Sequence, residues 1–143
     1  MTEPDGAVSF AVIVPAYNEA ANMPDLFADL SATFSRFSLD GEVVLVDDGS
    51  ADGTSEAARS AAATAGLSKV TILRHRNNRG KTSAIVTAAR ATAAPILVLF
   101  DADLQHATDE IPRFLDALDK GYDLIAGRKV GAYPKRFVSS VYN

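Results

Sequence analysis

Strand-like and helix-like segments alternate along this chain of 143 residues, and this alternation restricts its possible folds more than any other feature. Short apolar runs, many of them β-branched, predict strands over 8–14, 42–46, 69–73, 96–100 and 122–126. Apolar residues three and four positions apart, or alanine-rich stretches, predict helices over 22–34, 55–65, 81–93, 108–121 and 134–142. Asn22 and Thr108 are the predicted N-caps of two of these helices. The alternation therefore predicts an α/β fold, a mainly parallel twisted sheet with helices on both faces.

Polar turns follow three of the predicted strands at the point where each strand ends. Residues 17–19 (Tyr-Asn-Glu) follow the first strand, 47–49 (Asp-Asp-Gly) the second, and 101–103 (Asp-Ala-Asp) the fourth. Open α/β sheets bind ligands beyond the carboxyl ends of their strands. Gathering like charges at that edge is unfavourable unless they serve a site. We therefore predict one shared binding site, the alternative being solvated loops whose acids cap helices.

Asp101 and Asp103 are the first candidates for metal ligands. Alternate residues of an extended segment point the same way, so these two carboxylates can converge on one point. They repel each other unless a cation or hydrogen-bond donors lie between them. Hard divalent cations take oxygen ligands and commonly share them with substrate phosphates. The pair therefore predicts Mg²⁺ or Mn²⁺ as a cofactor.

The composition favours a single domain over residues 1–143 and excludes several classes of protein. The longest apolar stretch, 93–100, is too short to cross a bilayer, which needs about 20 apolar residues. Residues 1–6 lack the basic and apolar regions of a signal peptide. The absence of cysteine excludes disulfides and cysteine-based zinc sites. We therefore predict a cytoplasmic protein, either soluble or bound to a membrane surface.

Charge is distributed unevenly along the chain. The formal net charge is −4, yet 128–143 hold four basic residues and no acid, which leaves 10 basic and 18 acidic residues in 1–127. A basic end on an acidic body suggests an anionic partner near that end, with a solvated terminal helix as the alternative. Arg74, Arg76 and Arg79 are predicted to form a solvated surface. The overall acidity argues against nucleic-acid binding, which usually shows a basic domain.

With these residues in view, the chain resembles the family 2 glycosyltransferases, which have the nucleotide-sugar-binding GT-A fold. The matching motifs, in order, are VIVPAYNE at 12–19, VDDGS at 46–50, DGT at 52–54, NRGK at 78–81, DADLQ at 101–105 and GR at 127–128. The Leu-Gln that follows the acid pair is most similar to the polyprenyl-phosphate branch, which includes dolichyl-phosphate mannose synthases. That branch moves a sugar from a nucleotide diphosphate to a lipid phosphate.

The resemblance implies roles for the residues after the first two strands. Pro15, Tyr17 and Glu19 would line the nucleoside pocket, and Asp47 or Asp48 would hold the base. This is chemically coherent, because a tyrosine ring offers an apolar face to a base and a carboxylate accepts hydrogen bonds from base or ribose edges.

The resemblance also implies which residues face the metal and the phosphates. Asp101, Asp103 and Gln105 would surround the metal, with Asp101 also contacting the donor and Asp103 acting in catalysis. Lys81 begins a predicted helix, where it and backbone N–H groups would meet the donor diphosphate. Thr82 stands where the family often has a second glycine.

The acceptor site would lie near the end of the chain. The branch shows a similar Gly-x-Arg followed by Arg-x-x-x-Ser, which implies that the acceptor phosphate binds to Arg128, Arg136 and Ser140, with Arg128 also acting in catalysis. On a helix, Arg136 and Ser140 share a face because they are four positions apart. A phosphate monoester is already anionic at pH 7, so its attack on the anomeric carbon needs no general base. The loop 130–134 is short for the family.

We therefore expect an inverting, metal-dependent transferase that moves mannose or glucose from GDP-mannose or UDP-glucose to a dolichyl or undecaprenyl phosphate. A transferase acting on a polysaccharide hydroxyl and an inactive nucleotide-sugar-binding module are the alternatives. The chain ends early for a catalytic domain of the family, which predicts a truncated form or a site completed by a partner subunit or a homodimer. Over 8–128 it would bind the nucleotide, and 128–143 would begin the acceptor region, at the cytoplasmic face of a membrane.

Overall fold

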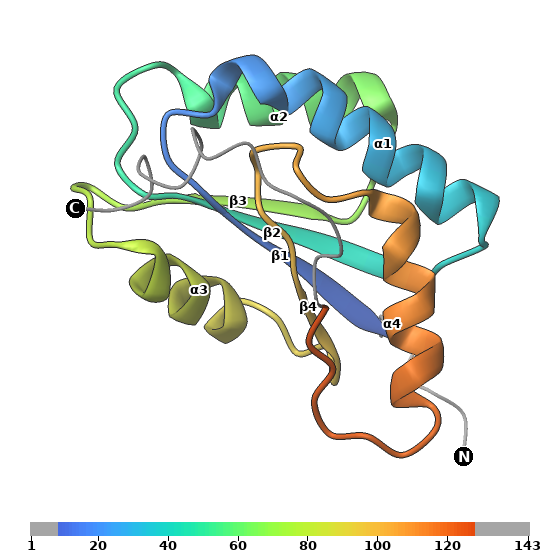
Figure 1. The fold of residues 1–143 in the computed structure, drawn as a ribbon. Helices are drawn as coiled ribbons and strands as arrows, with labels where there is room; N and C mark the ends of the chain where they lie inside the picture. Colours follow the sequence, from blue (N-terminus) through green and yellow to red (C-terminus); the bar gives the residue numbers. More distant parts are fainter. Residues whose placement is uncertain (1–8, 128–143) are drawn as a thin grey trace, which may run out of the picture.

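The computed structural model describes residues 9–127, and Figure 1 shows how their helices and strands are arranged. The strands are β1 (Phe10–Ala16), β2 (Gly41–Asp47), β3 (Val70–Arg74) and β4 (Leu97–Leu99). The α-helices are α1 (Met23–Arg36), α2 (Thr54–Ala65), α3 (Lys81–Arg90) and α4 (Ile111–Leu118). Two short 3-10 helices, η1 (Ala20–Asn22) and η2 (Thr108–Glu110), precede α1 and α4.

The described strands form one parallel sheet in the order β3-β2-β1-β4. The chain moves outward from β1 to β3 and then crosses back to β4, so the strand order reverses between β1 and β4. Helices α1 and α2 lie on one face of the sheet and α3 lies on the other (Figure 1). The predicted α/β fold is confirmed, and the reversal marks the position where such sheets bind ligands.

The larger core lies between the sheet and helices α1 and α2. The apolar face of α1 that the sequence predicts is buried and consists of Met23, Leu26, Phe27, Leu30 and Phe34. It packs in one cluster with Val12 and Val14 of β1 and Leu45 of β2. Complete burial of a side chain such as Phe27 contributes about 1.5–3 kcal/mol. This core holds β1 and β2 in place, and therefore the turns that follow them.

The second face of the sheet carries a smaller core under α3. Ala84 and Ala88 of this helix are completely buried against Ile13 and Val44. Small side chains at these positions let the helix approach the sheet closely. Because α3 begins at Lys81, this packing fixes that residue near the carboxyl edge of the strands.

The predicted strand over 122–126 is wrong. Residues 122–126 belong to no strand, and the side chains of Tyr122 and Leu124 are 61% and 84% exposed. A strand needs a neighbour to pair its backbone groups. None of the described strands pairs with this segment, so its apolar composition alone does not make it part of the sheet. The predicted helix over 134–142 lies outside the described residues.

The boundaries and caps of other elements also differ from the predictions. β1 extends to Ala16 and includes Pro15, which lies beyond Ile13, the last residue that pairs with β4. Asn22 occupies the N-cap position of α1, but its side chain donates to Glu19 Oε2 at 2.6 Å instead of capping the helix.

Thr108 is the first residue of η2 and caps no helix with its side chain. Its hydroxyl lies 2.6 Å from Thr33 Oγ1 and 3.2 Å from the backbone oxygen of Asp29. Both partners belong to α1. The threonine therefore ties the segment before α4 to α1, a contact between residues far apart that local sequence patterns do not indicate.

Candidate functional site

The turns after β1 and β2 are joined by hydrogen bonds between residues far apart in the sequence. The backbone N–H of Asn18 donates to Ser50 Oγ at 2.8 Å, and the N–H of Ala51 donates to Asn18 Oδ1 at 3.0 Å. The N–H of Glu19 donates to Thr54 Oγ1 at 3.0 Å. Asn18 has a φ of 52°, a left-handed conformation that asparagine tolerates better than most residues. The two turns predicted to share a site are therefore adjacent and fixed.

The carboxylate of Asp47, at the end of β2, is fully buried. Its Oδ1 accepts the backbone N–H of Ser50 at 2.8 Å, and its Oδ2 accepts from Ser55 Oγ at 2.5 Å and from the Arg74 guanidinium at 2.8 Å. Burial alone would raise the pKa of Asp47, but these hydrogen bonds and the arginine charge outweigh it and lower that pKa below its usual value. Asp47 is therefore ionised and holds its turn to the end of β3.

Asp48 is equally buried and fixes the loop that leads into α3. Its Oδ1 accepts the backbone N–H of Arg79 at 2.9 Å, and its Oδ2 accepts the N–H of Gly80 at 2.8 Å. Its Oδ1 also lies 2.7 Å from Nδ1 of His75, whose Nε2 lies 2.8 Å from Thr87 Oγ1. This buried network links the end of β2 to both the start and the middle of α3.

The partners of these two acids position the edge of the sheet, and the sequence pattern does not indicate them. The Arg74 side chain is 42% exposed, in line with the predicted solvated surface, but its guanidinium also pairs with the buried Asp47, which the prediction did not include. Strand register is the signal that could have found it, since Arg74 and Asp47 are partners at the ends of β3 and β2. Both Asp47 and Asp48 hold loops in this structure, and their predicted contact with a base stays a prediction.

Asp101 lies just beyond β4 and is paired with the first residue of α3. Lys81 Nζ lies 2.5 Å from Asp101 Oδ1, and His106 Nε2 lies 3.6 Å from Asp101 Oδ2. The side chains of Lys81 and Asp101 are 34% and 33% exposed, so this ion pair is open to solvent. The start of α3 therefore lies beside the acid turn after β4, while the predicted contact of Lys81 with a donor diphosphate stays a prediction.

The turns after β1 and β4 also lie close enough to interact electrostatically. Burial raises the pKa of Glu19, and the nearby carboxylates of Asp103 and Asp52 raise it further, against the lowering effect of the hydrogen bond from Asn22. The parallel pairing of β1 with β4 brings turns 17–19 and 101–103 to the same edge, at the reversal of strand order. This gathering of negative charge is what a bound cation would relieve.

The remaining predicted donor and metal residues lie along the same edge. Pro15 is buried in β1, and Tyr17 follows that strand with 40% of its side chain exposed. Gln105 is exposed, and its backbone N–H donates to Asp103 Oδ1 at 3.1 Å. Leu104, between them, has a φ of 61°, a strained conformation for a leucine. Strain of this kind often occurs in ligand-binding turns.

The predicted acceptor residues, Arg128, Arg136 and Ser140, lie outside the described residues. The site described by the structure is therefore the edge formed by the turns after β1, β2 and β4. None of the described helices is long and apolar enough to span a bilayer.

The acid pair after β4 suits a cation that is shared with a ligand. Within residues 9–127, no group of three or more histidine, cysteine or acidic side chains is placed to hold a metal by itself. Mg²⁺ and Mn²⁺ are commonly bound by one or two carboxylates, with substrate phosphates and water completing the coordination. Asp101 and Asp103 supply oxygen donors of this kind and fit such a metal.

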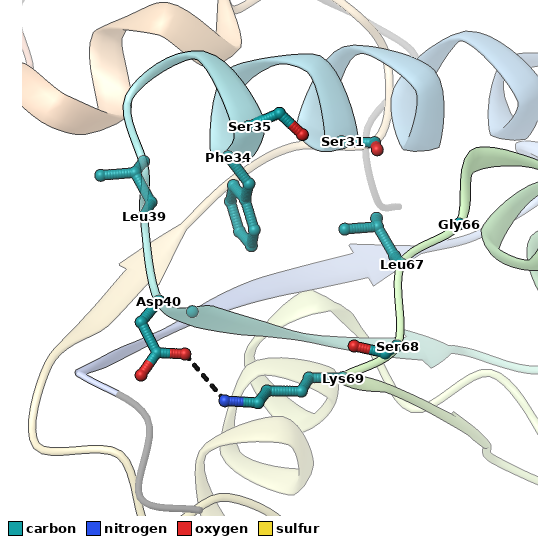
Figure 2. Close-up of a pocket in the computed structure, with 10 residues that line it drawn as sticks. Ser31, Phe34, Ser35, Leu39, Asp40, Gly66, Leu67, Ser68 and Lys69 are labelled. Carbon is teal, nitrogen blue, oxygen red and sulfur yellow. Dashed lines mark hydrogen bonds and ion pairs between the residues drawn. The ribbon is translucent and has the colours of Figure 1, made fainter.

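A hollow of about 310 Å³ lies at the opposite edge of the sheet (Figure 2). It is lined by the end of α1 and by the segments that lead into β2 and β3, with Lys69 Nζ paired to Asp40 Oδ1 at 2.7 Å across its rim. None of the predicted site residues lines it. Its position beyond the amino ends of the strands separates it from the acid turns.

The family model described as Glycosyl transferase family 2 matches residues 11–140. An undecaprenyl-phosphate 4-deoxy-4-formamido-L-arabinose transferase from Aeromonas hydrophila is 39% identical over 115 residues, which are 80% of this chain and 35% of the relative. The corresponding enzyme of Enterobacter is 34% identical over 125 residues, 87% of this chain and 38% of the relative. The chain thus spans about a third of the length of these relatives.

Solved structures show the same architecture. A mannosyltransferase from Pyrobaculum calidifontis, in complex with GDP-Man and Mn²⁺, is 33% identical with a TM-score of 0.69, over 82% of this chain and 34% of that one. Glucosyl-3-phosphoglycerate synthase from Mycobacterium tuberculosis is 23% identical with a TM-score of 0.60, over 78% and 40% of the two chains. At that identity, the second match supports the fold alone.

Proposed function

The chain belongs to glycosyl transferase family 2, and we propose that it is the donor-binding part of an inverting transferase that moves a hexose from a nucleotide diphosphate to a polyprenyl phosphate. The observation that carries this proposal is the convergence of the turns after β1, β2 and β4 at the reversal of strand order, where Lys81 also pairs with Asp101. Polar turns at this position bind nucleotides in open α/β sheets. The undecaprenyl-phosphate transferases and the mannosyltransferase described above support the acceptor class and the donor class, respectively.

Each turn has its own part in the proposed donor complex. Tyr17 offers its exposed ring to the base, and Glu19 accepts hydrogen bonds from the nucleoside. Pro15, buried at the end of β1, supports the same pocket. Asp101 and Asp103, with Gln105, hold the divalent cation against the diphosphate. A Mg²⁺ or Mn²⁺ ion bound there supplies positive charge that stabilises the leaving nucleoside diphosphate.

Asp47, which ends β2, and Asp48, which follows it, act in this scheme through the loops that they hold. Asp48 fixes the backbone of Gly80 and therefore the start of α3, where Lys81 and the first N–H groups of the helix face the edge of the sheet. Asp47 fixes the turn that is bonded to Asn18 and Glu19. We also propose, as the sequence predicts, that Asp47 or Asp48 contacts the base of the donor nucleotide.

The acceptor is proposed to be a lipid phosphate. We assign Arg128, Arg136 and Ser140 to its phosphate, because cations and a hydroxyl can hold an anionic nucleophile without removing a proton from it. The relatives named for undecaprenyl phosphate favour a polyprenyl chain over a sugar hydroxyl. A lipid acceptor places the protein at a membrane surface.

Calorimetric titration of the 143-residue chain with GDP or UDP, with and without Mn²⁺, tests the donor site. We expect Mn²⁺-dependent nucleotide binding in the wild type and a loss of at least about tenfold in Asp103→Ala, with an unchanged melting temperature. Asp116→Ala is the matched control, because Asp116 is an exposed acid of α4. Unchanged affinity for nucleotide and Mn²⁺ in Asp103→Ala would refute the proposed metal site.

A transfer assay then tests the acceptor. Short-chain polyprenyl phosphate is compared with free sugars, using GDP-mannose and UDP-glucose as donors. Turnover with the lipid phosphate supports the proposal, and Arg136→Ala should then weaken lipid use while sparing donor binding. Turnover with sugars alone would identify a polysaccharide enzyme, and nucleotide binding without any turnover would identify a binding module.

A further inference from the structure

Lys81 occupies a position beside Asp101 that a metal ion would also need. Its Nζ lies 2.5 Å from Asp101 Oδ1, whereas the other lysine ion pair of the described residues, Lys69 with Asp40, measures 2.7 Å. His106 Nε2 lies 3.6 Å from Asp101 Oδ2, so nitrogen atoms stand near both oxygens. A divalent cation at either oxygen would lie within a few ångströms of the ammonium and would be repelled by it.

We propose that Lys81 couples cation binding to donor binding, by neutralising Asp101 when the site is empty and moving to the donor diphosphate when the cation takes its place. This inference rests on the proposed function, since it requires a nucleotide diphosphate and a divalent cation at this edge. It assigns to Lys81 a positioning role that differs from simple phosphate contact, because the same ammonium competes with the metal.

The fixed backbone around Lys81 confines this movement to its side chain. The preceding N–H, of Gly80, is held by Asp48 Oδ2 at 2.8 Å, and Ala84, one turn later, is completely buried against the sheet. Lysine has a flexible four-carbon stem, so its ammonium can change partner without moving α3. The new partner would lie close by, because phosphate groups also favour the N–H groups at the start of this ten-residue helix.

Such an exchange makes the cation and the nucleotide bind cooperatively. The cation releases an ammonium that the diphosphate can use, and the diphosphate removes the charge that repels the cation. Thermodynamic linkage requires the two effects to be equal, so Mn²⁺ should tighten nucleotide binding by the same factor as the nucleotide tightens Mn²⁺ binding. Couplings of this type are typically about 5–150-fold.

The test measures Mn²⁺ affinity by electron paramagnetic resonance and nucleotide affinity by calorimetry, each with and without the other ligand, on the full chain. Lys81→Met should bind Mn²⁺ alone about two- to fivefold more tightly than the wild type, because an exposed ion pair no longer competes. The same variant should show weaker coupling between Mn²⁺ and GDP or UDP, with only the part due to direct contact between the cation and the diphosphate remaining. Thermal unfolding checks that it folds.

Two control variants separate this role from general electrostatics and from structure. Arg76→Met removes one positive charge from the exposed loop before α3 and should change neither the Mn²⁺ affinity nor the coupling by more than about twofold. Lys81→Arg keeps the charge and should restore weak Mn²⁺ binding and part of the coupling. Rescue by arginine would not follow if the residue served only the packing of α3.

The outcomes distinguish the inference from the function on which it rests. If the wild type binds neither Mn²⁺ nor nucleotide, the proposed function fails and the inference fails with it. If both ligands bind the wild type, but Lys81→Met weakens Mn²⁺ binding or keeps the full coupling, the inference alone is overturned. Tighter Mn²⁺ binding together with reduced coupling supports it.

Discussion

Asp48 accepts a hydrogen bond at 2.8 Å from the backbone N–H of Gly80, a residue 32 positions later in the chain. This bond ties the carboxyl end of β2 to the start of α3. It determines where Lys81 stands, and therefore which carboxylate the lysine can reach. A fully buried acid thus shapes the edge of the sheet without being exposed there.

The first prediction concerns this acid. Asp48→Asn replaces one carboxylate oxygen by an amide N–H₂ group, which in either orientation faces the backbone N–H donor of Arg79 or that of Gly80. Leaving buried donors without an acceptor should lower the free energy of unfolding by about 2–4 kcal/mol. Urea unfolding measures this change. Asp116→Asn, on the exposed face of α4, should change it by no more than about 0.5 kcal/mol.

The second prediction is a pH dependence due to Asp47. The pKa of its carboxyl is lowered in the folded chain, so its contribution to stability is present above the usual value of 3.8 and is lost as the pH falls through the lower folded value. Asp47→Asn should therefore cost about 2–4 kcal/mol at pH 7 and progressively less below about pH 4. Urea unfolding across this range measures the difference, and a cost that grows on acidification contradicts the prediction.

The third prediction has the opposite sign and concerns Glu19. The pKa of its carboxyl is raised by burial and by Asp103 and Asp52, so ionisation of Glu19 opposes folding. Stability from the neutral form is fully present below the usual value of 4.5 and is lost as the pH rises through the higher folded value. Glu19→Gln should therefore be more stable than the wild type at neutral pH.

The gain in Glu19→Gln should stay below about 1 kcal/mol, because water screens this partly exposed side chain. Thermal unfolding at pH 4 and at pH 7 tests it, since the difference between variant and wild type should be largest at pH 7. Equal differences at both values would show that the charge of Glu19 plays no part.

The fourth prediction compares two glycines with the same backbone conformation. Gly49 and Gly66 have φ values of 78° and 74°, but a Cβ on Gly49 would lie 2.6 Å from the backbone carbonyl carbon of Asn77, whereas nothing lies within 4 Å of one on Gly66. Gly66→Ala should cost about 1–2 kcal/mol of unfolding free energy for the left-handed backbone. Gly49→Ala should cost a further 1–3 kcal/mol or so for overpacking.

Chemical denaturation of both variants measures the two costs. The difference between them reports how tightly the turn after β2 is packed against the loop before α3. If the two variants lose the same free energy of unfolding, the loop before α3 can shift to accommodate the new methyl group. Such a shift would also contradict the proposal that Asp48 holds this loop in place.

Local patterns predicted the parallel sheet, its four described strands and the apolar face of α1. Such patterns depend on residues close together in the sequence, and parallel strands joined by helices necessarily bring their carboxyl ends to one edge. The turn containing Tyr17 and the acid pair Asp101 and Asp103 could be placed at that edge for the same reason. The segment 122–126 has a strand-like composition too, but composition cannot supply the neighbouring strand that it would need.

The sequence by itself therefore determined that acid turns gather beyond β1, β2 and β4. Only the tertiary structure decided which of those acids are buried and which face the site. Asp47 and Asp48 find donors on Arg74, His75 and Gly80, 27 to 32 residues away, whereas Asp101 remains partly exposed beside Lys81. The physical reason is that the partner of a buried charge comes from whichever element packs beside it, and that neighbour is fixed by the folded chain and not by spacing along it.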